Sequence, residues 1–561
     1  MPQITLKDIS LRDYNLTERV SHLRNIYFRA VPEICTERPR LITQFSIDNR
    51  LFEKEQISIL DKANAYRYVL EHRESIIRHS TAYEKAAHNK ELKQFELPKK
   101  CFSLFAGSTT SKFKGVPLYP EFLAMTLWPE LRTISERASN PYKITDKQVD
   151  ELNYDIFPHW LNSNILELAR KEIHRNNLEK NNGRDKKDPL EIKLLKRLVF
   201  FLASKPNCIS HTIPDFSRAI KLGLRNIIDE ANDKKNGTDD ASKKEFYTAI
   251  SVALEGIIAY SNRLADRAEE LAHDETDPDL KKELLEMAAV NRRVPEHAAR
   301  TFREGLTTVW ICWVAIHLEN PDVGLSLGRL DQILYELYQH DIDKGTVTIE
   351  DAVELICCLW LKIGDHVPTI ADAAEKLFGG TGSNQAITIG GVDKHGKNAV
   401  NDLTYVMLRA TELMMLRDPN LNARYHSDEN PDEYLRRLCE VNIQTRATPA
   451  LHNDKAVFKA LTAKGETEEQ AWDYGVVGCV EPCSNGRAYG HSASILLNLT
   501  SVLELALFNG RHRQTGNLLI SSETGNPATF TTFEDFRHAF ASQVRWMAEK
   551  TTNLNNIFSC V

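Results

Sequence analysis

Two side chains that could do chemistry, the thiol of Cys479 and the carboxyl of Glu481, stand two residues apart in the segment 474–490. The segment begins with a short apolar run, which predicts a strand, and continues with glycine, proline and asparagine, which predict a loop. Residues two apart in an extended chain point to the same side, so we expect both groups to face one cavity, with Cys479 buried at the tip of the loop. A thiol beside a carboxyl can be a nucleophile or a hydrogen-atom donor next to a general acid or base.

The elements that must position this loop are mostly helices. Apolar residues recur every three or four positions, which predicts helices, over 56–78, 245–273, 280–290, 299–318, 349–363 and 402–416. A further helix over 494–508 would hold the loop rigid, and 385–391 predicts a strand that ends in a Gly-Gly turn. The charged, turn-rich segments 177–189 and 231–244 are predicted to be exposed insertions. Together these patterns predict one large α/β domain.

Composition excludes several classes of protein. The chain of 561 residues has 71 Lys and Arg against 78 Asp and Glu, so its net charge is −7, which argues against a broad nucleic-acid-binding face. The first residues lack the pattern of a signal peptide, and the longest apolar stretch, 309–318, is too short to span a bilayer core of about 30 Å. The ten cysteines are scattered, which favours reduced thiols over a disulfide scaffold. We expect a cytoplasmic protein with no membrane or nucleic-acid partner.

Three other motifs have an ordinary structural explanation. The stretch 391–397 has the spacing of a phosphate-binding loop, but asparagine follows it and no helix is predicted there. We expect an exposed turn after a strand that binds no nucleotide. The adjacent Cys357 and Cys358 fall in a helical pattern, where burial is the usual environment of cysteine. Cys479 and Cys483 could begin a zinc site, but His491 alone does not complete the ligand set.

The segment around Cys479 resembles the thiyl-radical cysteine loop of the glycyl radical enzymes, the relatives of pyruvate formate-lyase that include glycerol and diol dehydratases. The resemblance starts from Gly-Cys-Val-Glu-Pro at 478–482, preceded by Asp-Tyr-Gly at 473–475. It continues in order over nearly the whole chain. Further segments that resemble family motifs are 32–38, 106–122, 210–216, 301–305, 326–332, 389–391, 417–421 and 453–454.

This resemblance implies a ten-stranded barrel of two five-stranded half-barrels, with helices outside and the cysteine on a loop inside. It implies that a glycyl radical takes a hydrogen atom from Cys479, and that the resulting thiyl radical takes one from the substrate, with Glu481 as the acid or base. A closed barrel would isolate the radical from water and oxygen. The implied partners are a small-molecule substrate, an activating enzyme with an iron–sulfur cluster and S-adenosylmethionine, and a second copy in a homodimer. The chain itself is expected to bind no metal or cofactor.

The chain departs from the family pattern in two places near the site. The family's radical motif, of the type Arg-Val-x-Gly-Tyr, is not found, so 1–561 resembles the N-terminal portion of the catalytic domain, with an incomplete barrel and the radical glycine on a residue outside the chain. Pyruvate formate-lyase proper has two adjacent cysteines in this loop, whereas Cys479 stands between Gly478 and Val480. Pyruvate cleavage is therefore disfavoured.

The family positions that hold substrate hydroxyl groups fall on residues that are mostly small or apolar: His211, Val323, Gly324, Ser492 and Ala493, with Leu496 beside them. Such a lining cannot satisfy several hydroxyl groups. We therefore expect a less polar substrate, or one held by groups outside this chain. His211 either contacts the substrate or only anchors its own loop.

Three interpretations of the whole chain are left open. The first is a truncated glycyl radical lyase that breaks a C–C or C–S bond, or less readily a C–O or C–N bond, with a dehydratase of a small hydroxylated substrate as its variant. The second is a non-catalytic fragment or a split subunit that needs a separate chain carrying the glycyl radical. The third is a nucleotide-binding protein, which rests on 391–397 alone.

Overall fold

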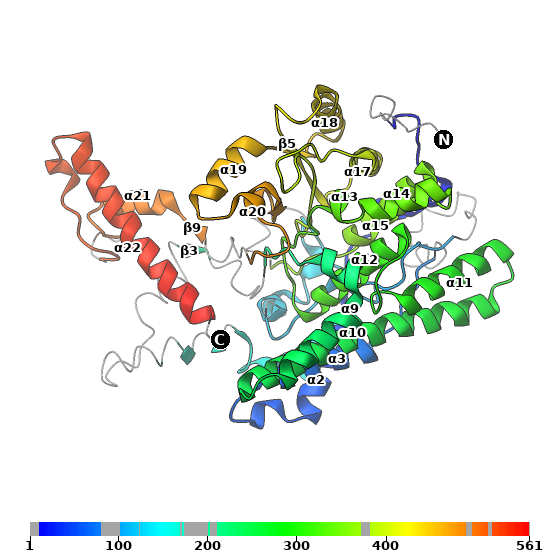
Figure 1. Cartoon of the computed structure of the whole chain (residues 1–561). Coiled ribbons are helices and arrows are strands. Elements are labelled where there is room, and N and C mark those ends of the chain that lie inside the picture. The colour runs from blue at the N-terminus through cyan, green and yellow to red at the C-terminus, as the bar shows by residue number, and fades with distance from the viewer. Residues whose placement is uncertain are drawn as a thin grey trace. The chain divides into compact units, whose positions relative to one another are not determined.

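Figure 1 shows the computed structural model of the chain. The structure describes residues 11–79, 101–122, 124–165, 167–168, 171–172, 175, 200–201, 210–371, 382–489, 496–513, 516 and 519–559. The chain divides into two compact units, of which the first is 1–119, 127–156 and 211–490 and the second is 120–126, 157–210 and 491–561. The loop that carries Cys479 belongs to the first unit.

Helices make up most of the first unit. They are α1 (Glu18–Arg29), α2 (Glu37–Asp48), α3 (Ile59–His72), α5 (Asp146–Asp150), α9 (Phe216–Asn236), α10 (Ala241–Asp274), α11 (Pro278–Arg293), α12 (Phe302–Glu319), α13 (Leu330–Ile333), α14 (Tyr335–Lys344), α15 (Ile349–Gly364), α17 (Asp402–Met414), α18 (Asp432–Thr445), α19 (Asp454–Ala463) and α20 (Glu468–Trp472). Short 3₁₀ or π turns are η2 (Leu51–Glu53), η4 (Ala124–Glu130), η5 (Ile134–Glu136) and η6 (Glu151–Ile156). All six helices predicted from apolar periodicity are confirmed, as α3, α10, α11, α12, α15 and α17.

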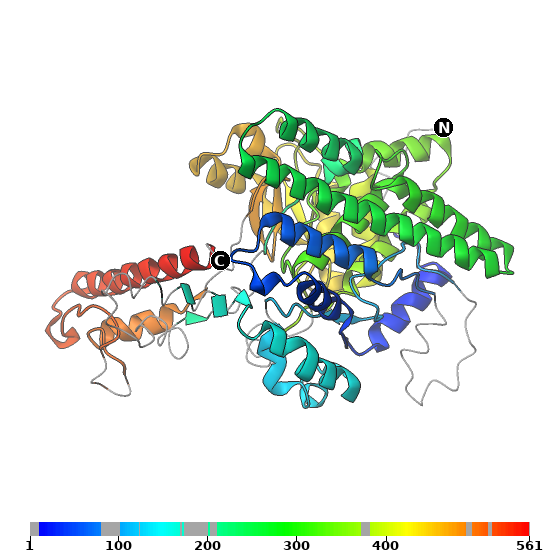
Figure 2. The same ribbon diagram turned by 90° about the horizontal axis from the view of Figure 1, so that it is seen from below.

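The long helix α10 organises one side of the first unit. It packs against α3, α9 and α11, and Figure 2 shows α3 lying alongside it. The segment 231–244 joins α9 to α10 and is largely exposed, as predicted, but most of it is the end of one helix and the start of the next. The other predicted insertion, 177–189, lies outside the described residues.

The strands of the first unit pair in three small groups. β1 (Glu33–Cys35) pairs in parallel with β2 (Gly115–Pro117), and β4 (Ala386–Gly390), β5 (Asn420–Tyr425) and β6 (Ala450–Asn453) form a parallel sheet in that order. β7 (Tyr474–Val477) and β8 (Glu481–Ser484) form an antiparallel hairpin. The strand predicted over 385–391 is confirmed as β4, and all five of its residues are buried.

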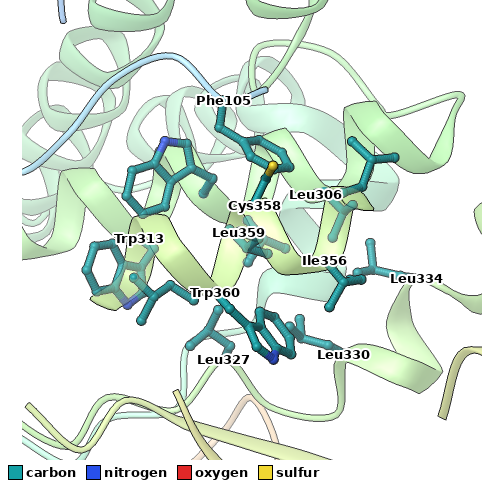
Figure 3. Close-up of a cluster of buried hydrophobic side chains, with 14 of the residues drawn as sticks. Phe105, Leu306, Trp313, Leu327, Leu330, Leu334, Ile356, Cys358, Leu359 and Trp360 are labelled. Carbon is teal, nitrogen blue, oxygen red and sulfur yellow. The ribbon is translucent and has the colours of Figure 1, made fainter. Parts of the chain in front are cut away.

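The core of the first unit lies between α12 and α15. Figure 3 shows Trp313 of α12 and Cys358 and Trp360 of α15 in one cluster with Phe105 and several leucines. Cys357 and Cys358 are each 1% exposed, so their prediction as core residues is confirmed. The apolar stretch 309–318 is likewise a buried helix segment, within α12.

The second unit has its own elements. They are α6 (Phe157–Trp160), β3 (Phe200–Phe201), β9 (Leu496–Leu497), α21 (Leu499–Leu507), η7 (Pro527–Thr529) and α22 (Phe533–Ser559). β3 and β9 pair in antiparallel fashion, and α21 packs against α22. The helix predicted over 494–508 is α21, which begins later because the Asn498 side chain caps it by accepting a hydrogen bond from the Ser501 N–H. Among the described residues, no helix of either unit has the length and apolar character needed to cross a membrane.

Candidate active site

Cys479 lies at the tip of the β7–β8 hairpin, in the turn 478–480. Val477 pairs with Glu481 across the turn, so thiol and carboxyl are at the same end of the hairpin. All of β7 is buried, but Cys479 is exposed. The prediction that Cys479 is buried is therefore wrong. β7 packs against β4 and β8 contacts α20, whereas Cys479 and Val480 in the turn are exposed.

Two hydrogen bonds join β7 and the first residue of the turn to the rest of the first unit. The Val476 N–H donates to Thr388 Oγ1 on β4 at 2.8 Å, and the Gly478 N–H donates to the Gly324 carbonyl oxygen at 2.8 Å. These two hydrogen bonds position the start of the turn against β4 and against the loop at 320–326.

A buried ion pair fixes the start of the same strand. Asp454 accepts two hydrogen bonds from the Arg424 guanidinium, at 3.0 and 3.1 Å, and one from the Tyr474 hydroxyl at 2.7 Å. Arg424 also donates to the carbonyl oxygens of Tyr474 and Trp472. Both charged side chains are fully buried, and a paired, hydrogen-bonded charge of this kind tolerates little displacement.

Two asparagines outside the hairpin contact Cys479. Asn384, just before β4, donates from Nδ2 to Cys479 Sγ at 3.5 Å, and Asn420, at the start of β5, donates to the Cys479 carbonyl oxygen at 2.6 Å. Sequence analysis missed both, because they lie 95 and 59 residues from Cys479 along the chain. Only Asn420 had any signal, since it falls in the stretch 417–421 that resembles a family motif.

The structure brings three of the predicted substrate residues to the hairpin. The His211 N–H donates to the Val323 carbonyl oxygen at 3.0 Å. A Cβ on Gly324 would lie 3.0 Å from Gly478 Cα and 3.1 Å from His211 Nε2. A Cβ on Gly478 would lie 2.3 Å from His211 Cδ2. The imidazole thus packs against two glycines that leave no room for side chains. The other predicted residues, Ser492 and Ala493, and the Leu496 side chain lie outside the described residues.

Unusual backbone conformations gather at this place. His211 and Asn384, neither of them glycine, have φ of 57° and 53°, and Gly324 and Gly478 have φ of 81° and 57°. Left-handed residues that are not glycine are strained, and they concentrate where function requires a particular geometry. Two such residues, His211 and Asn384, with two left-handed glycines beside them, lie around this thiol, as is typical of an active site.

His211 and Glu481 form the acid–base part of the site. Glu481 Oε1 is 3.7 Å from His211 Nε2, and Oε2 accepts the Val480 N–H at 2.8 Å. Burial lowers the pKa of His211, and the nearby Glu481 charge opposes that shift only in part. The imidazole is therefore neutral near pH 7.

The surroundings of Cys479 favour its protonated form. Partial burial and the charge of Glu481 raise the pKa of the thiol, and Arg417 opposes them. A cysteine nucleophile needs a lowered pKa because its thiolate reacts. A hydrogen-atom donor needs an intact S–H bond. A raised pKa disfavours the nucleophile of the two roles open to this thiol.

The alternative motifs gain no support as ligand sites. Within the part of the chain that the structure describes, no group of three or more His, Cys, Asp and Glu side chains could hold a metal ion; His491 lies outside that part. The stretch 391–397 is a largely exposed turn after β4, in which Asp393 Oδ1 accepts the N–H groups of His395 and Lys397 at 2.9 Å. The predicted turn is confirmed, and the absence of nucleotide binding stays a prediction.

Comparison with known proteins places this site in a family. The chain belongs to the pyruvate formate lyase-like family, whose model matches residues 16–561. It is 31% identical over 438 residues to isethionate sulfite-lyase of Nitratidesulfovibrio vulgaris, a match that covers 76% of this chain and 52% of that protein. It is 26% identical to (2S)-3-sulfopropanediol dehydratase of Klebsiella oxytoca, over 97% of this chain and 62% of the relative.

A solved structure described for 1,2-propanediol dehydration in Roseburia inulinivorans matches the fold. Its TM-score is 0.86 at 27% identity, and the match covers 97% of this chain and 60% of the other. The expected glycyl radical enzyme family and its fold class are therefore confirmed. The chain spans about half to three fifths of the length of the proteins it matches.

Proposed function

We propose that this chain carries the hydrogen-atom relay of a glycyl radical lyase, with Cys479 as the relay and Glu481 as the acid or base. The observation that carries the proposal is an accessible thiol, kept protonated, at the tip of a hairpin whose base is fixed by buried hydrogen bonds. The Cys479 thiol could exchange a hydrogen atom with a glycyl radical, because its exposed S–H bond can be approached from outside the hairpin.

The glycyl radical supplies the first abstraction of a hydrogen atom. Cys479 gives up the hydrogen of its S–H bond and becomes a thiyl radical. The thiyl radical takes a hydrogen atom from a substrate C–H bond, which re-forms the S–H bond and leaves the unpaired electron on carbon. As the neighbouring bond breaks, the Glu481 carboxylate takes the proton of the substrate's hydroxyl group, and the leaving group departs with the bonding electron pair; in a dehydration Glu481 passes that proton to the leaving hydroxyl, which departs as water. The product radical then takes the hydrogen atom back from Cys479, which becomes a thiyl radical again and would recover a hydrogen atom from the glycine.

His211, Val323 and Gly324 would line the place where the substrate's C–H bond meets the thiol, together with Ser492 and Ala493. The relay requires near-attack geometry, and the close packing of His211 on Gly324 and Gly478 supports a fixed position for the imidazole. The neutral ring beside Glu481 can hold a hydroxyl group. We assign His211 to substrate contact on this basis.

The bond broken is proposed to be C–S, with C–O as the second candidate. The similarity to isethionate sulfite-lyase supports cleavage of a C–S bond, and the similarity to the structure described for 1,2-propanediol dehydration supports cleavage of a C–O bond. We further infer a homodimer in the cytoplasm, where thiols stay reduced. We also infer an activating enzyme with an iron–sulfur cluster and S-adenosylmethionine, by analogy with the glycyl radical family.

The test is anaerobic turnover of isethionate and of 1,2-propanediol by the complete, activated protein. Cys479→Ala and Cys479→Ser should each lower turnover at least about 1,000-fold, since neither retains an S–H bond. The matched control is Cys483→Ala, which removes a thiol from the same hairpin and should keep turnover within about threefold of wild type. Turnover by Cys479→Ala at the rate of the control would contradict the proposal.

A further inference from the structure

Arg417 is an exposed cation between α17 and β5 whose guanidinium makes no hydrogen bond or close ion pair with any residue in the described ranges. Its side chain crosses Gly382, where a Cβ would lie 2.3 Å from Arg417 Nε and 2.7 Å from Cδ. Any other residue at 382 would displace the arginine. The absence of a side chain at Gly382 thus leaves room for the arginine at this place.

The same chain segments hold Cys479. Asp418, next to Arg417, accepts the Ser383 N–H at 2.6 Å and the Gln385 N–H at 3.2 Å. These bonds tie the start of β5 to the start of β4. Between them, Asn384 donates to Cys479 Sγ. Arg417 therefore lies at the edge on which the Cys479 turn rests, and its charge is close enough to lower the pKa of that thiol.

The carboxyl groups nearby already have partners. Both oxygens of Asp418 accept backbone N–H groups, and Glu481 accepts the Val480 N–H and faces His211. Arg417 attracts the buried Asp418 carboxyl electrostatically, but no hydrogen bond or close ion pair engages its guanidinium among the described residues. A guanidinium presents a planar fork of donors that matches two oxygens of a carboxylate or sulfonate.

We propose that Arg417 binds the anionic group, carboxylate or sulfonate, of the substrate whose C–H bond faces Cys479. The assignment of the site as a substrate site rests on the proposed function, but binding of the anion does not require the radical. The expectation of a less polar substrate considered only the apolar lining. Arg417 supplies the donors that this lining lacks, whereas the Asn420 amide already donates to the backbone of the Cys479 turn.

The test is binding of three small molecules to the full, non-activated chain, measured by calorimetry: isethionate, 3-hydroxypropionate and uncharged 1,2-propanediol. Wild-type protein should bind one of the two anions at least tenfold more tightly than the diol. Arg417→Gln should weaken that anion at least tenfold and leave the diol within twofold. Arg417→Lys keeps the charge but loses the planar pair of donors, so its affinity for the anion should lie between those of wild type and Arg417→Gln. Tighter binding of isethionate would identify a sulfonate site, and tighter binding of 3-hydroxypropionate a carboxylate site.

Arg436→Gln is the matched control, because it removes the same charge from an exposed position on α18; it should leave the affinity for the anion unchanged. Equal affinities of wild type and Arg417→Gln for both anions, or equal losses in Arg417→Gln and Arg436→Gln, would overturn the proposal. If the Cys479→Ala variant turned over substrate while binding of the anion still depended on Arg417, the proposed radical function would be wrong and the anion site would stand.

Discussion

The base and the tip of the β7–β8 hairpin differ in burial, in hydrogen bonding and in backbone conformation. At the base, Arg424, Asp454 and Tyr474 are fully buried and joined by short hydrogen bonds. At the tip, Cys479 is exposed, Val480 is 51% exposed, and Gly478 has a left-handed backbone. The base supplies rigidity and the tip supplies access. A relay that exchanges hydrogen atoms with two partners needs both.

The largest effect on stability is expected at the base. Arg424→Met leaves Asp454 buried without its counter-charge, so the free energy of unfolding should fall by about 3–5 kcal/mol. Urea denaturation measures this. The control is Lys455→Met, which breaks the exposed Lys455–Asp428 pair (2.6 Å) and should cost at most about 1 kcal/mol. If the free energy of unfolding fell equally in the two variants, the buried ion pair at the base would stabilise the chain no more than an exposed ion pair does.

A smaller loss of stability, but a large loss of turnover, is expected at Gly478. In Gly478→Ala the new Cβ would collide with the His211 ring and would force a left-handed alanine. The strain should cost about 1–3 kcal/mol, and displacement of the thiol and imidazole should lower turnover about 100-fold.

Gly345→Ala separates crowding from backbone strain. Gly345 has φ of 68°, but a Cβ there meets no atom within 4 Å. It should lose stability to a similar degree and keep full turnover. If Gly478→Ala also keeps full turnover, the packing of His211 on the hairpin is irrelevant to the site.

The smallest effect is expected at the exposed side chain of the tip. Val480→Ala removes two methyl groups from a half-exposed position, so the free energy of unfolding should change by no more than about 0.5 kcal/mol. Thermal or urea unfolding checks this value. A loss above 2 kcal/mol would show that the tip is packed rather than accessible.

Sequence predicted best what is decided locally. The helix α15 begins at the predicted residue, Ile349, because the apolar period agrees with a capping box formed by Thr348, directly before the helix, and Asp351 in its first turn. The apolar run at 474–477 is likewise a strand, as predicted, but 481–484 in the predicted loop is a second strand. Alternation along an extended chain predicted that Cys479 and Glu481 face one cavity; because Cys479 lies in the turn between the strands, that premise does not hold, and the shared cavity stays a prediction.

Sequence failed where distant segments decide the outcome. Whether Cys479 is buried depends on what packs around the turn, and its neighbours Asn384 and Asn420 are far away in the chain. The role of Arg417 is equally invisible, because it requires the pairing of β4 with β5. The resemblance to a family marked the stretch 417–421 that contains Arg417 and Asn420, but not that this stretch lies beside the thiol.

The central claim is that Cys479 is an accessible thiol held in its protonated form, and its alkylation by iodoacetamide tests this directly. Only the thiolate reacts, so the pH at half-maximal rate reports the thiol's pKa. Peptide mapping of the full chain from pH 6 to 11 should place it above the value for free cysteine, about 8.5. It should fall in Glu481→Gln, where one cause of the raised pKa is removed. A midpoint below about 8.5 would identify a nucleophile and contradict the account.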